Sequence, residues 1–476
     1  MSVRTRFAPS PTGFLHVGSA RTALFAYLFA KRHGGEFILR IEDTDKEREV
    51  PGAIEHIIES LTWLNVSWDE SVDIGGPYAP YKQSERLDTY QVYARRLIEA
   101  GHAYPDPYTE EELSQLRAKA EEEKRPFLFR EHRPETFGEW DGTTPLRFRT
   151  PTIKRFTWQD AVFGELSAGE EALDDFILIK SDGYPTYNFA HVVDDIEMKI
   201  THVMRGQEFV SSTPKFLSLY EALNIAPPVF ATLPPILGES GSKKLSKRDG
   251  AKDVLDYRTD GYLPEALVNF LALLGWNPGG EQEQFSMQEL IELFSLERVQ
   301  RSGAQFDEVK LLNLNRAWMR TLSDEAYAAH VVSGGADPAQ VQVALHLLRE
   351  RAQTFGEARE MLVGELAFLF TAPSLEATAL TEKEPGDKST NTKDALLAIK
   401  DLLAGATITT MEEAKTLLMP LADEAEARGK GGRGAVLWPL RYALSGQQRS
   451  PDPFTLVALL GIEESCRRVD SALAIL

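Results

Sequence analysis

The chain has 476 residues, of which 43% are hydrophobic and 26% charged, and its formal net charge is −20. This composition is typical of a soluble globular protein, and the length allows roughly two to four domains. No apolar run is long enough to cross a bilayer and the N-terminus has no signal-peptide pattern, so we expect a cytoplasmic protein without membrane contact. The single cysteine, Cys466, excludes an internal disulfide and a zinc site made of cysteines.

The negative net charge by itself argues against a nucleic-acid partner. Net charge, however, does not report how arginines and lysines are placed on one face of a protein. RNA that is recognised by shape requires only local basic patches. The net charge therefore does not exclude an RNA partner, and the sequence motifs are the better evidence on this question.

The N-terminal stretch predicts a strand, a tight loop and a helix. Residues 3–7 indicate a short buried strand, and two prolines and Gly13 prevent the strand from continuing. Apolar residues then recur with helical spacing, so we expect the helix N-cap near Gly18 or Ser19. Free amides and the positive helix end make such a loop an anion site. An ordinary strand–helix turn is the alternative.

The next segments predict a parallel sheet interrupted by an insertion. Residues 36–42 indicate a second strand, and the strand–helix–strand order implies a parallel pair whose ends carry the site. From about residue 101 to residue 167 the pattern changes to a charged helix and short strands, which we interpret as an insertion. We expect the sheet to resume with a strand at residues 176–180 and another at 200–204.

Beyond Tyr262 the pattern is helical almost to the end, which predicts an all-α C-terminal half. The polar stretch 376–393 indicates an exposed linker. Residues 429–434 have the spacing Gly-x-Gly-x-x-Gly, but a helical pattern precedes them where a dinucleotide fingerprint requires a strand. We therefore expect a basic loop there, facing RNA.

A second motif, Lys244-Leu245-Ser246-Lys247-Arg248, follows a stretch rich in glycine and serine. A flexible loop that delivers two lysines can hold a triphosphate while negative charge moves onto the leaving pyrophosphate. The alternative is a solvated basic loop without a ligand.

These two motifs resemble the two signatures of class I aminoacyl-tRNA synthetases, in the versions found in glutamyl-tRNA synthetases. The first is Pro9-Ser10-Pro11-Thr12-Gly13-Phe14-Leu15-His16-Val17-Gly18, and the second is Lys244–Arg248. Similarity to the same family continues through residues 40–45, 181–187, 192–195, 202–208 and 211–214. The resemblance therefore covers nearly the whole catalytic half of the chain.

The resemblance implies an α/β Rossmann-like catalytic domain with an α+β insertion, followed by an all-α region. Five parts are expected: residues 1–100 and 176–240 as the halves of the catalytic domain, 101–175 as an insertion binding the tRNA acceptor end, 241–320 as the signature-loop and stem-contact domain, and 321–476 as the anticodon-binding region.

The resemblance also implies a glutamate pocket. The planar guanidinium of an arginine can donate two hydrogen bonds to one carboxylate. We therefore expect Arg6 at the side-chain carboxylate of glutamate and Arg205 at the other end of the glutamate molecule. Glu42 suits the ammonium group, whereas a strand-end ion pair is its alternative role. The implied glutamate-binding residues are Arg6, Ser10, Glu42, Tyr187 and Arg205, although Tyr187 alone would be read as a core tyrosine.

For ATP, the resemblance implies that His16 donates to the α-phosphate and that Gly18 allows close approach of the nucleoside. Glu208 would meet the nucleoside, and Lys244 and Lys247 the leaving phosphates. The implied ATP-binding residues are Ala8, Ser10, His16, Gly18, Glu208, Lys244, Ser246 and Lys247, with His16, Lys244 and Lys247 catalytic. Mg²⁺ is expected to accompany ATP and not to occupy a protein cage.

For tRNA, the resemblance implies contacts by Asp45, Arg351 and Arg441, with Arg351 matching enzymes that discriminate glutamate tRNA from glutamine tRNA. Surface arginines with salt-bridge partners are the alternative reading. Many relatives carry a zinc knuckle after an Ala-Tyr pair, but residues 103–109 contain no cysteine, so we expect no zinc. His191 is read equally as a packing residue or a pocket residue, and Phe209 leaves stacking possible.

The implied function is glutamate–tRNA ligation by a monomer. The α-carboxylate of glutamate attacks the α-phosphorus of ATP, pyrophosphate leaves, and the 3′-terminal ribose of tRNA(Glu) accepts the glutamate. A glutaminyl enzyme should carry a different first signature and a β-barrel anticodon region. A truncated relative that charges a modified base, or a small-molecule nucleotidyltransferase, would lack the helical half. The remaining alternative is an RNA-binding paralogue without catalysis.

Overall fold

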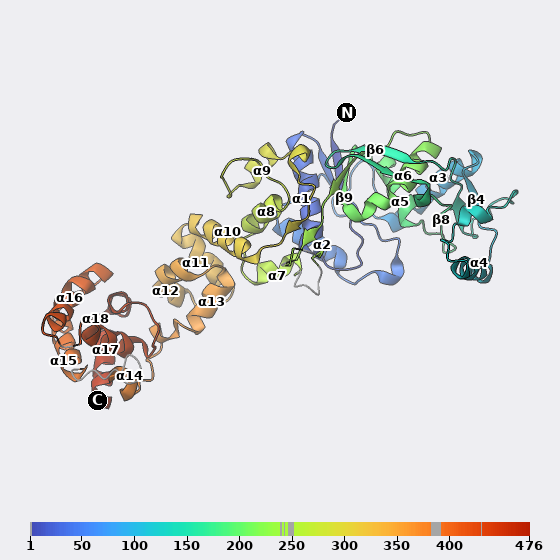
Figure 1. The fold of residues 1–476 in the computed structure, drawn as a ribbon. Helices are drawn as coiled ribbons and strands as arrows, with labels where there is room; N and C mark the ends of the chain where they lie inside the picture. The colour runs from blue at the N-terminus through green and yellow to red at the C-terminus, as the bar shows by residue number, and fades with distance from the viewer. Residues whose placement is uncertain (1, 239, 242, 246–251, 382–391, 430) are drawn as a thin grey trace. The chain divides into compact units, whose positions relative to one another are not determined.

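The computed structural model describes residues 2–238, 240–241, 243–245, 252–381, 392–429 and 431–476. The chain forms two compact units, Met1–Trp318 and Met319–Leu476 (Figure 1). The five-part division expected from the sequence is finer than this one and stays a prediction. No helix in the described part of the chain is long and apolar enough to span a membrane.

The first sheet of the N-terminal unit is parallel and contains β1 (Arg4–Phe7), β2 (Glu36–Leu39) and β3 (Glu70–Ser71). α1 (Val17–Arg32) connects β1 to β2, which confirms the predicted strand–helix–strand unit. The N-cap is His16, shortly before the predicted position near Gly18 or Ser19. A histidine ring nitrogen accepts hydrogen bonds from backbone amides as a Ser or Asp oxygen would.

The second sheet has the order β7 (Gly164–Ala168), β6 (Phe156–Asp160), β10 (Val229–Leu233) and β9 (His202–Gly206). β10 runs parallel to both of its neighbours. The amide of Thr201, just before β9, donates to the carbonyl of Arg4 on β1 at 3.0 Å, so the two sheets meet there. α5 (Tyr187–Glu197) packs against α6 (Thr213–Ala222) beside this sheet (Figure 1).

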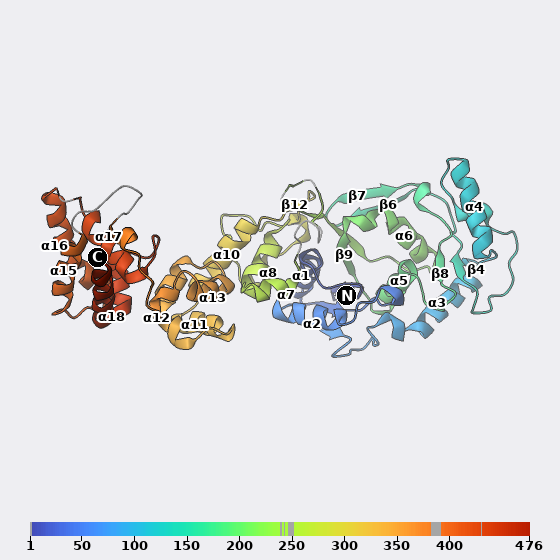
Figure 2. The same cartoon turned by 90° about the horizontal axis from the view of Figure 1, so that it is seen from below.

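The strands of the third sheet differ from those expected for the insertion. β4 (Ala103–Pro105), β5 (Leu146–Phe148) and β8 (Ile177–Ile179) form an antiparallel sheet near α4 (Glu110–Glu122) (Figure 2). We expected β8 to resume the catalytic sheet, whereas it pairs with β5. β6, expected within the insertion, instead pairs with β10. A hydrophobic pattern predicts a strand but does not name its partner.

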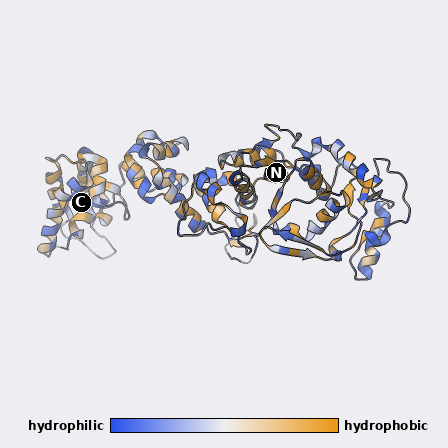
Figure 3. Ribbon diagram, turned by 90° about the horizontal axis from the view of Figure 1, so that it is seen from above, coloured by the Kyte–Doolittle hydropathy of each residue, from blue (hydrophilic) through white to orange (hydrophobic). Residues whose placement is uncertain are grey.

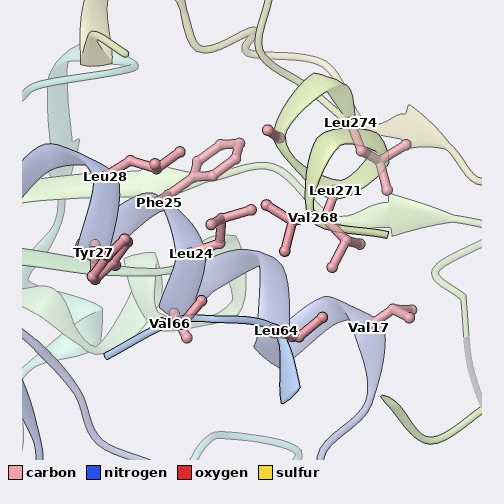
Figure 4. Packing of buried hydrophobic residues seen from close by; sticks show 14 of the residues in the cluster. Val17, Leu24, Phe25, Tyr27, Leu28, Leu64, Val66, Val268, Leu271 and Leu274 are labelled. Carbon is pink, nitrogen blue, oxygen red and sulfur yellow. The ribbon is translucent and has the colours of Figure 1, made fainter. Parts of the chain in front are cut away.

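α1 is the centre of the largest hydrophobic core. Its residues from Ala23 to Ala30 are almost completely buried, because one side faces the sheets and the other faces α8 (Pro264–Leu273) and α9 (Met287–Leu293). Figure 4 shows Leu24 and Phe25 of α1 directed towards Val268 and Leu271 of α8. This packing places the N-terminal end of α1, and the loop before it, on a rigid support.

The remainder of the N-terminal unit is helical, with α2 (Ala53–Trp63), α3 (Leu87–Glu99), α7 (Val254–Thr259) and α10 (Glu308–Thr321), the last of which crosses the boundary between units. Two short strands lie among these elements, β11 (Ile236–Leu237) and β12 (Ala304–Gln305), and they pair with each other. β12 was not predicted, because two residues carry no periodic signal.

The C-terminal unit consists of helices, as predicted: α11 (Asp324–Ser333), α12 (Pro338–Arg351), α13 (Phe355–Val363), α14 (Ala377–Thr381), α15 (Thr392–Leu403), α16 (Met411–Ala427), α17 (Gly434–Ser445) and α18 (Pro453–Ile475). Hydrophobic and hydrophilic residues alternate along these helices, as in amphipathic helices packed on one face (Figure 3). The predicted linker at 376–393 is partly wrong, since α14 and the start of α15 lie within it. α16 precedes the glycines at 429–434, which confirms that no strand does.

Candidate active site

A cavity of about 860 Å³ in the N-terminal unit is lined by residues of both sequence motifs. Of the residues predicted to bind glutamate or ATP, ten line it: Arg6, Ala8, Ser10, His16, Gly18, Glu42, Tyr187, Arg205, Glu208 and Lys244. Ser246 and Lys247 lie outside the described residues. These side chains come from segments up to 238 residues apart in the chain, namely from Arg6 to Lys244.

His16 caps α1 and faces the cavity. Its Nδ1 accepts hydrogen bonds from the amides of Gly18 at 3.1 Å and Ser19 at 3.4 Å. An accepting Nδ1 leaves the proton of a neutral imidazole on Nε2, which lies 3.3 Å from Ser19 Oγ. The loop therefore presents an N–H donor beside the positive end of a helix, an arrangement suited to a phosphate.

A buried network of charges forms the floor beside Arg6. Arg6 Nε and Nη2 donate to the two oxygens of Asp195 at 3.1 and 3.4 Å. Arg40 lies behind them, fully buried, and donates to Asp195 at 2.8 Å and to Glu42 at 2.9 Å. Asp195 and Arg40 were not singled out from the sequence. Their signal was only a charged residue next to apolar ones, Arg40 directly after β2 and Asp195 within α5, which indicates a paired buried charge.

This network sets the protonation of its two carboxylates differently. Burial acts to raise the pKa of Asp195, but the positive charges of Arg6 and Arg40 outweigh it and the pKa is lowered. Burial raises the pKa of Glu42 above its ordinary value, against the opposite effect of Arg40. Asp195 therefore stays ionised, whereas Glu42 is a carboxylate that a further cation would stabilise.

Arg205 supplies a buried donor in this region that has no hydrogen-bond partner among the described residues. It is 8% exposed, and its Nη1 is buried without a hydrogen-bond partner among them. Its guanidinium carbon lies 5.1 Å from the ring centre of Phe209 and 4.9 Å from that of Phe216. Burial lowers the pKa of Arg205. A buried cation with an unpaired donor is costly unless an anionic ligand completes it.

Tyr187 forms the wall next to Arg205, and His191 lies behind it. The two rings stack with their centres 4.8 Å apart, and His191 Nδ1 lies 2.8 Å from the carbonyl of Tyr187. Burial, followed by the positive charge of Arg205, lowers the pKa of His191 well below its ordinary value. His191 is absent from the cavity lining, so the structure gives it a packing position. Phe209 lies 5.7 Å from the Tyr187 ring.

Lys244 enters from the opposite side on a hairpin. The amide of Leu245 donates to the carbonyl of Ile236 at 2.8 Å, and Lys244 forms a bridge with Leu237. Lys244 Nζ donates to Glu208 Oε1 at 3.0 Å, with both side chains more than half exposed. An exposed pair of this kind is weak and can open for a phosphate.

The three predicted tRNA-binding residues lie outside the cavity lining. Asp45 is paired with Arg48 on the surface of the N-terminal unit. Arg351, at the end of α12, lies 3.3 Å from Glu365. Arg441 donates to the carbonyl of Gln448 at 2.8 Å and lies 4.8 Å from the Trp438 ring, while its Nε has no described partner. Arg433, in the glycine-rich loop, is paired with Asp423.

Across the described ranges, no three His, Cys, Asp or Glu side chains gather as a metal site would require. The acidic residues of the cavity are already engaged, Glu42 by Arg40 and Glu208 by Lys244. These donors do not form a cage for Mg²⁺, which favours several oxygens and retained waters. The geometry is compatible with an ion held chiefly by the phosphates of a nucleotide.

Comparison with known proteins extends over the whole chain. A family model described as tRNA synthetases class I (E and Q), catalytic domain, matches residues 2–313, and one described as an anticodon binding domain matches residues 310–473. A glutamate–tRNA ligase of Clostridium botulinum is 42% identical over 98% of this chain and 97% of its own length. One from Anaeromyxobacter is 40% identical over 99% of both chains.

Solved structures agree with these relatives. A glutamate tRNA ligase from Elizabethkingia meningosepticum, in complex with its amino acid, has a TM-score of 0.89 and 36% identity, covering 100% of this chain and 99% of that one. A glutamate-tRNA synthetase from Elizabethkingia anophelis has a TM-score of 0.85 and 36% identity, with 100% of both chains covered. Both sequence motifs, the fold and the full-length matches lead to one assignment: the chain belongs to the class I tRNA synthetases of the glutamate and glutamine group.

Proposed function

We propose that this protein is a glutamate–tRNA ligase that forms glutamyl-adenylate from glutamate and ATP and transfers glutamate to tRNA(Glu). One observation carries the proposal: the same cavity is lined by side chains suited to glutamate, Arg205 and Glu42, and by side chains suited to phosphates, His16 and Lys244. The full-length similarity to glutamate–tRNA ligases supports the same activity.

Glutamate carries two carboxylates and an ammonium group, and the cavity has a complement for each. The unpaired Nη1 of Arg205 is ready to take a carboxylate, whereas two nitrogens of Arg6 are already held by Asp195. Arg6 therefore contributes through Nη1, which has only a long contact of 3.4 Å with the carbonyl of Met204. Glu42 accepts the ammonium group, which lowers the cost of keeping this buried carboxylate ionised. Ser10 and Tyr187 complete the wall.

ATP occupies the side of the cavity formed by the loop before α1. Ala8 and Gly18 leave room for the nucleoside, Glu208 contacts it, and His16 donates through Nε2 to the α-phosphate. Lys244, together with Ser246 and Lys247 of the same motif, binds the leaving phosphates, and Mg²⁺ arrives with the nucleotide. The reaction then needs positioning and charge stabilisation but no covalent enzyme intermediate.

The C-terminal unit binds the anticodon region of the tRNA in this proposal. Arg351 and Arg441 contact the anticodon bases. The guanidinium of Arg351 lies at the end of a helix and that of Arg441 beside an aromatic ring, and neither is paired with a buried carboxylate. Asp45 is a further tRNA contact in this proposal. We expect Arg351 to discriminate against tRNA(Gln). The cytoplasmic location and the monomeric state also remain predictions.

The test is aminoacylation with purified tRNA(Glu) and tRNA(Gln) side by side, using labelled glutamate and ATP. We expect charging of tRNA(Glu) and little charging of tRNA(Gln). Binding of tRNA without any charging would instead identify the catalytically inactive RNA-binding paralogue. Equal charging of both tRNAs would leave the ligase activity in place and remove the proposed discrimination.

A further inference from the structure

Arg21 is a buried cation in the cavity wall that the proposed reaction does not use. It lies on the second turn of α1, is 3% exposed, and lines the same cavity as His16 and Lys244. Within the described ranges it forms no ion pair with a carboxylate, and its Nε has no hydrogen-bond partner. Burial lowers its pKa to about 10, with Glu208 acting in the opposite direction, so it is still charged at neutral pH.

The guanidinium of Arg21 joins two elements that are far away in the chain. Nη1 donates to the carbonyl of Leu274 at 3.1 Å, and Nη2 donates to the carbonyl of Pro234. Leu274 is the C-cap residue directly after α8, and α8 packs against α1 (Figure 4). Pro234 directly follows β10. One side chain therefore ties α1, α8 and the end of a sheet strand together.

The contact at the end of α8 depends on the backbone conformation of Gly275. Gly275 follows Leu274 with φ +98°, and a Cβ at this position would lie 3.4 Å from Arg21 Nη1. A glycine in this left-handed conformation turns the chain so that the Leu274 carbonyl faces α1. The carbonyl of Gly275 in turn accepts from the amide of Gln300.

The contact with Pro234 lies at the base of the hairpin that carries Lys244. Ile236 begins β11 two residues later, and its carbonyl accepts from the amide of Leu245 at 2.8 Å. Displacement of Pro234 would therefore be transmitted to Lys244 through a short hydrogen-bonded segment. Leu237 and Lys244 form the next bridge of the same hairpin.

Building on the proposed ligase activity, we propose that Arg21 is a positioning residue for adenylate formation, which fixes the base of the Lys244 hairpin against α1 and α8. Glu208, which also lines the cavity, acts to raise the pKa of Arg21 but forms no ion pair with it in the described part of the chain, so the phosphates of ATP would be the anion that offsets its buried charge. A guanidinium is suited to this role, because its planar group donates to two carbonyls in fixed directions, a geometry that an ammonium group does not have.

Pairing of β11 with β12 is a second anchor of the hairpin and a competing explanation for its position. The amide of Phe306 donates to the carbonyl of Leu237 at 2.9 Å. If this pairing alone held the hairpin, loss of Arg21 would lower stability but would leave ATP recognition unchanged. The two explanations therefore differ in the KM for ATP.

The experiment compares the wild type with Arg21→Met, Arg21→Lys and Arg468→Met in steady-state aminoacylation of tRNA(Glu), with ATP, glutamate and tRNA varied in turn. Arg468 is also 3% exposed and donates to a backbone carbonyl, that of Leu444, but it lies in the C-terminal unit. It is a control for the loss of a buried arginine that, unlike Arg21, also pairs with a carboxylate, that of Glu464, at 2.6 Å. Thermal unfolding with and without ATP is recorded for every variant.

We expect Arg21→Met to raise the KM for ATP about tenfold or more and to lower kcat, while the KM for glutamate changes less than about twofold. ATP should stabilise this variant less than the wild type. Arg21→Lys should recover only part of the ATP affinity, because it keeps the charge without both hydrogen bonds. Arg468→Met should lower stability and leave the KM for ATP unchanged.

An unchanged KM for ATP in Arg21→Met, an equal rise in the KM for glutamate, or full recovery by Arg21→Lys would overturn the positioning role. If Arg21→Met does not fold, Arg21→Lys carries the same comparison. An inactive wild type would refute the proposed ligase activity itself. An active wild type with unaltered Arg21 variants would refute only this inference.

Discussion

The backbone amide of Val254 donates a hydrogen bond of 2.9 Å to the carbonyl of Leu15. Next to it, Asp253 and His16 form an isolated antiparallel bridge. The chain that leaves the second motif is therefore tied to the residue that caps α1 in the first motif. Leu245, before the loop, is held by Ile236. Both ends of the segment that contains Ser246 and Lys247 are thus anchored beside the cavity.

Replacement of Arg205 should impair glutamate recognition more than ATP recognition. Arg205→Met removes the buried donor that has no partner among the described residues, so the KM for glutamate should rise about 100-fold. The KM for ATP in the same variant is the internal control and should change little. Equal changes in both constants would mean that Arg205 supports the cavity as a whole.

Glutamate affinity should depend on pH through Glu42. Burial raises the pKa of Glu42, and only its ionised form can accept the ammonium group. Lowering the pH towards this raised pKa should therefore protonate Glu42 and increase the KM for glutamate, while raising the pH restores affinity. The carboxylates of the substrate stay ionised above about pH 5, so they do not produce this effect.

The matched variant for this pH profile is Glu42→Gln, which keeps the size of the side chain but cannot ionise. It should show a high KM for glutamate at every pH and lose the acid-side dependence. Persistence of the wild-type profile in Glu42→Gln would assign the titration to another group.

The second motif should act mainly on the first step of the reaction. Lys247→Ala should slow adenylate formation about 100-fold in single-turnover measurements, because it removes a charge from the leaving phosphates. Lys243→Ala is the control, since Lys243 precedes the motif and does not line the cavity. A normal adenylation rate in Lys247→Ala would remove its assigned role.

Arg351 should control the choice between tRNAs. Arg351→Gln should loosen rejection of tRNA(Gln) about tenfold in the ratio of kcat/KM values, as loss of one base contact does. Arg467→Gln is a suitable control, because Arg467 is another exposed arginine paired with a glutamate on a helix. Unchanged selectivity would place the discriminating residue elsewhere.

The sheet β4-β5-β8 should be stabilised by ion pairs independently of zinc. Asp175 is fully buried and accepts from Arg133 at 2.7 Å, from Tyr104 Oη at 2.7 Å and from the amide of Thr150 at 3.0 Å. Asp175→Asn should lower the free energy of unfolding by about 3 kcal/mol, since it leaves Arg133 unpaired. A zinc chelator should leave urea unfolding of the wild type unchanged, and a shift with the chelator would reveal a metal.

Local patterns predicted the elements whose signals lie within a few residues of one another. The stretch 3–7, the break at the prolines and the helical spacing that follows predicted β1 and α1, because these preferences are set by near neighbours. The N-cap residue itself was not predicted, since histidine is not a common capping residue. β8 was predicted as a strand but assigned to the wrong sheet, because strand partners are chosen by packing between distant segments.

The sequence by itself determined the two motifs and the residue types that face glutamate and ATP, because each motif is contiguous and its chemistry follows from its side chains. Only the tertiary structure decided how those side chains are held. Asp195 reaches Arg6 across 189 residues of sequence, and Pro234 reaches Arg21 across 213. Such pairs form because an unpaired charge or carbonyl in the protein interior costs free energy. That cost depends on the tertiary structure, so it cannot be predicted from a local sequence pattern.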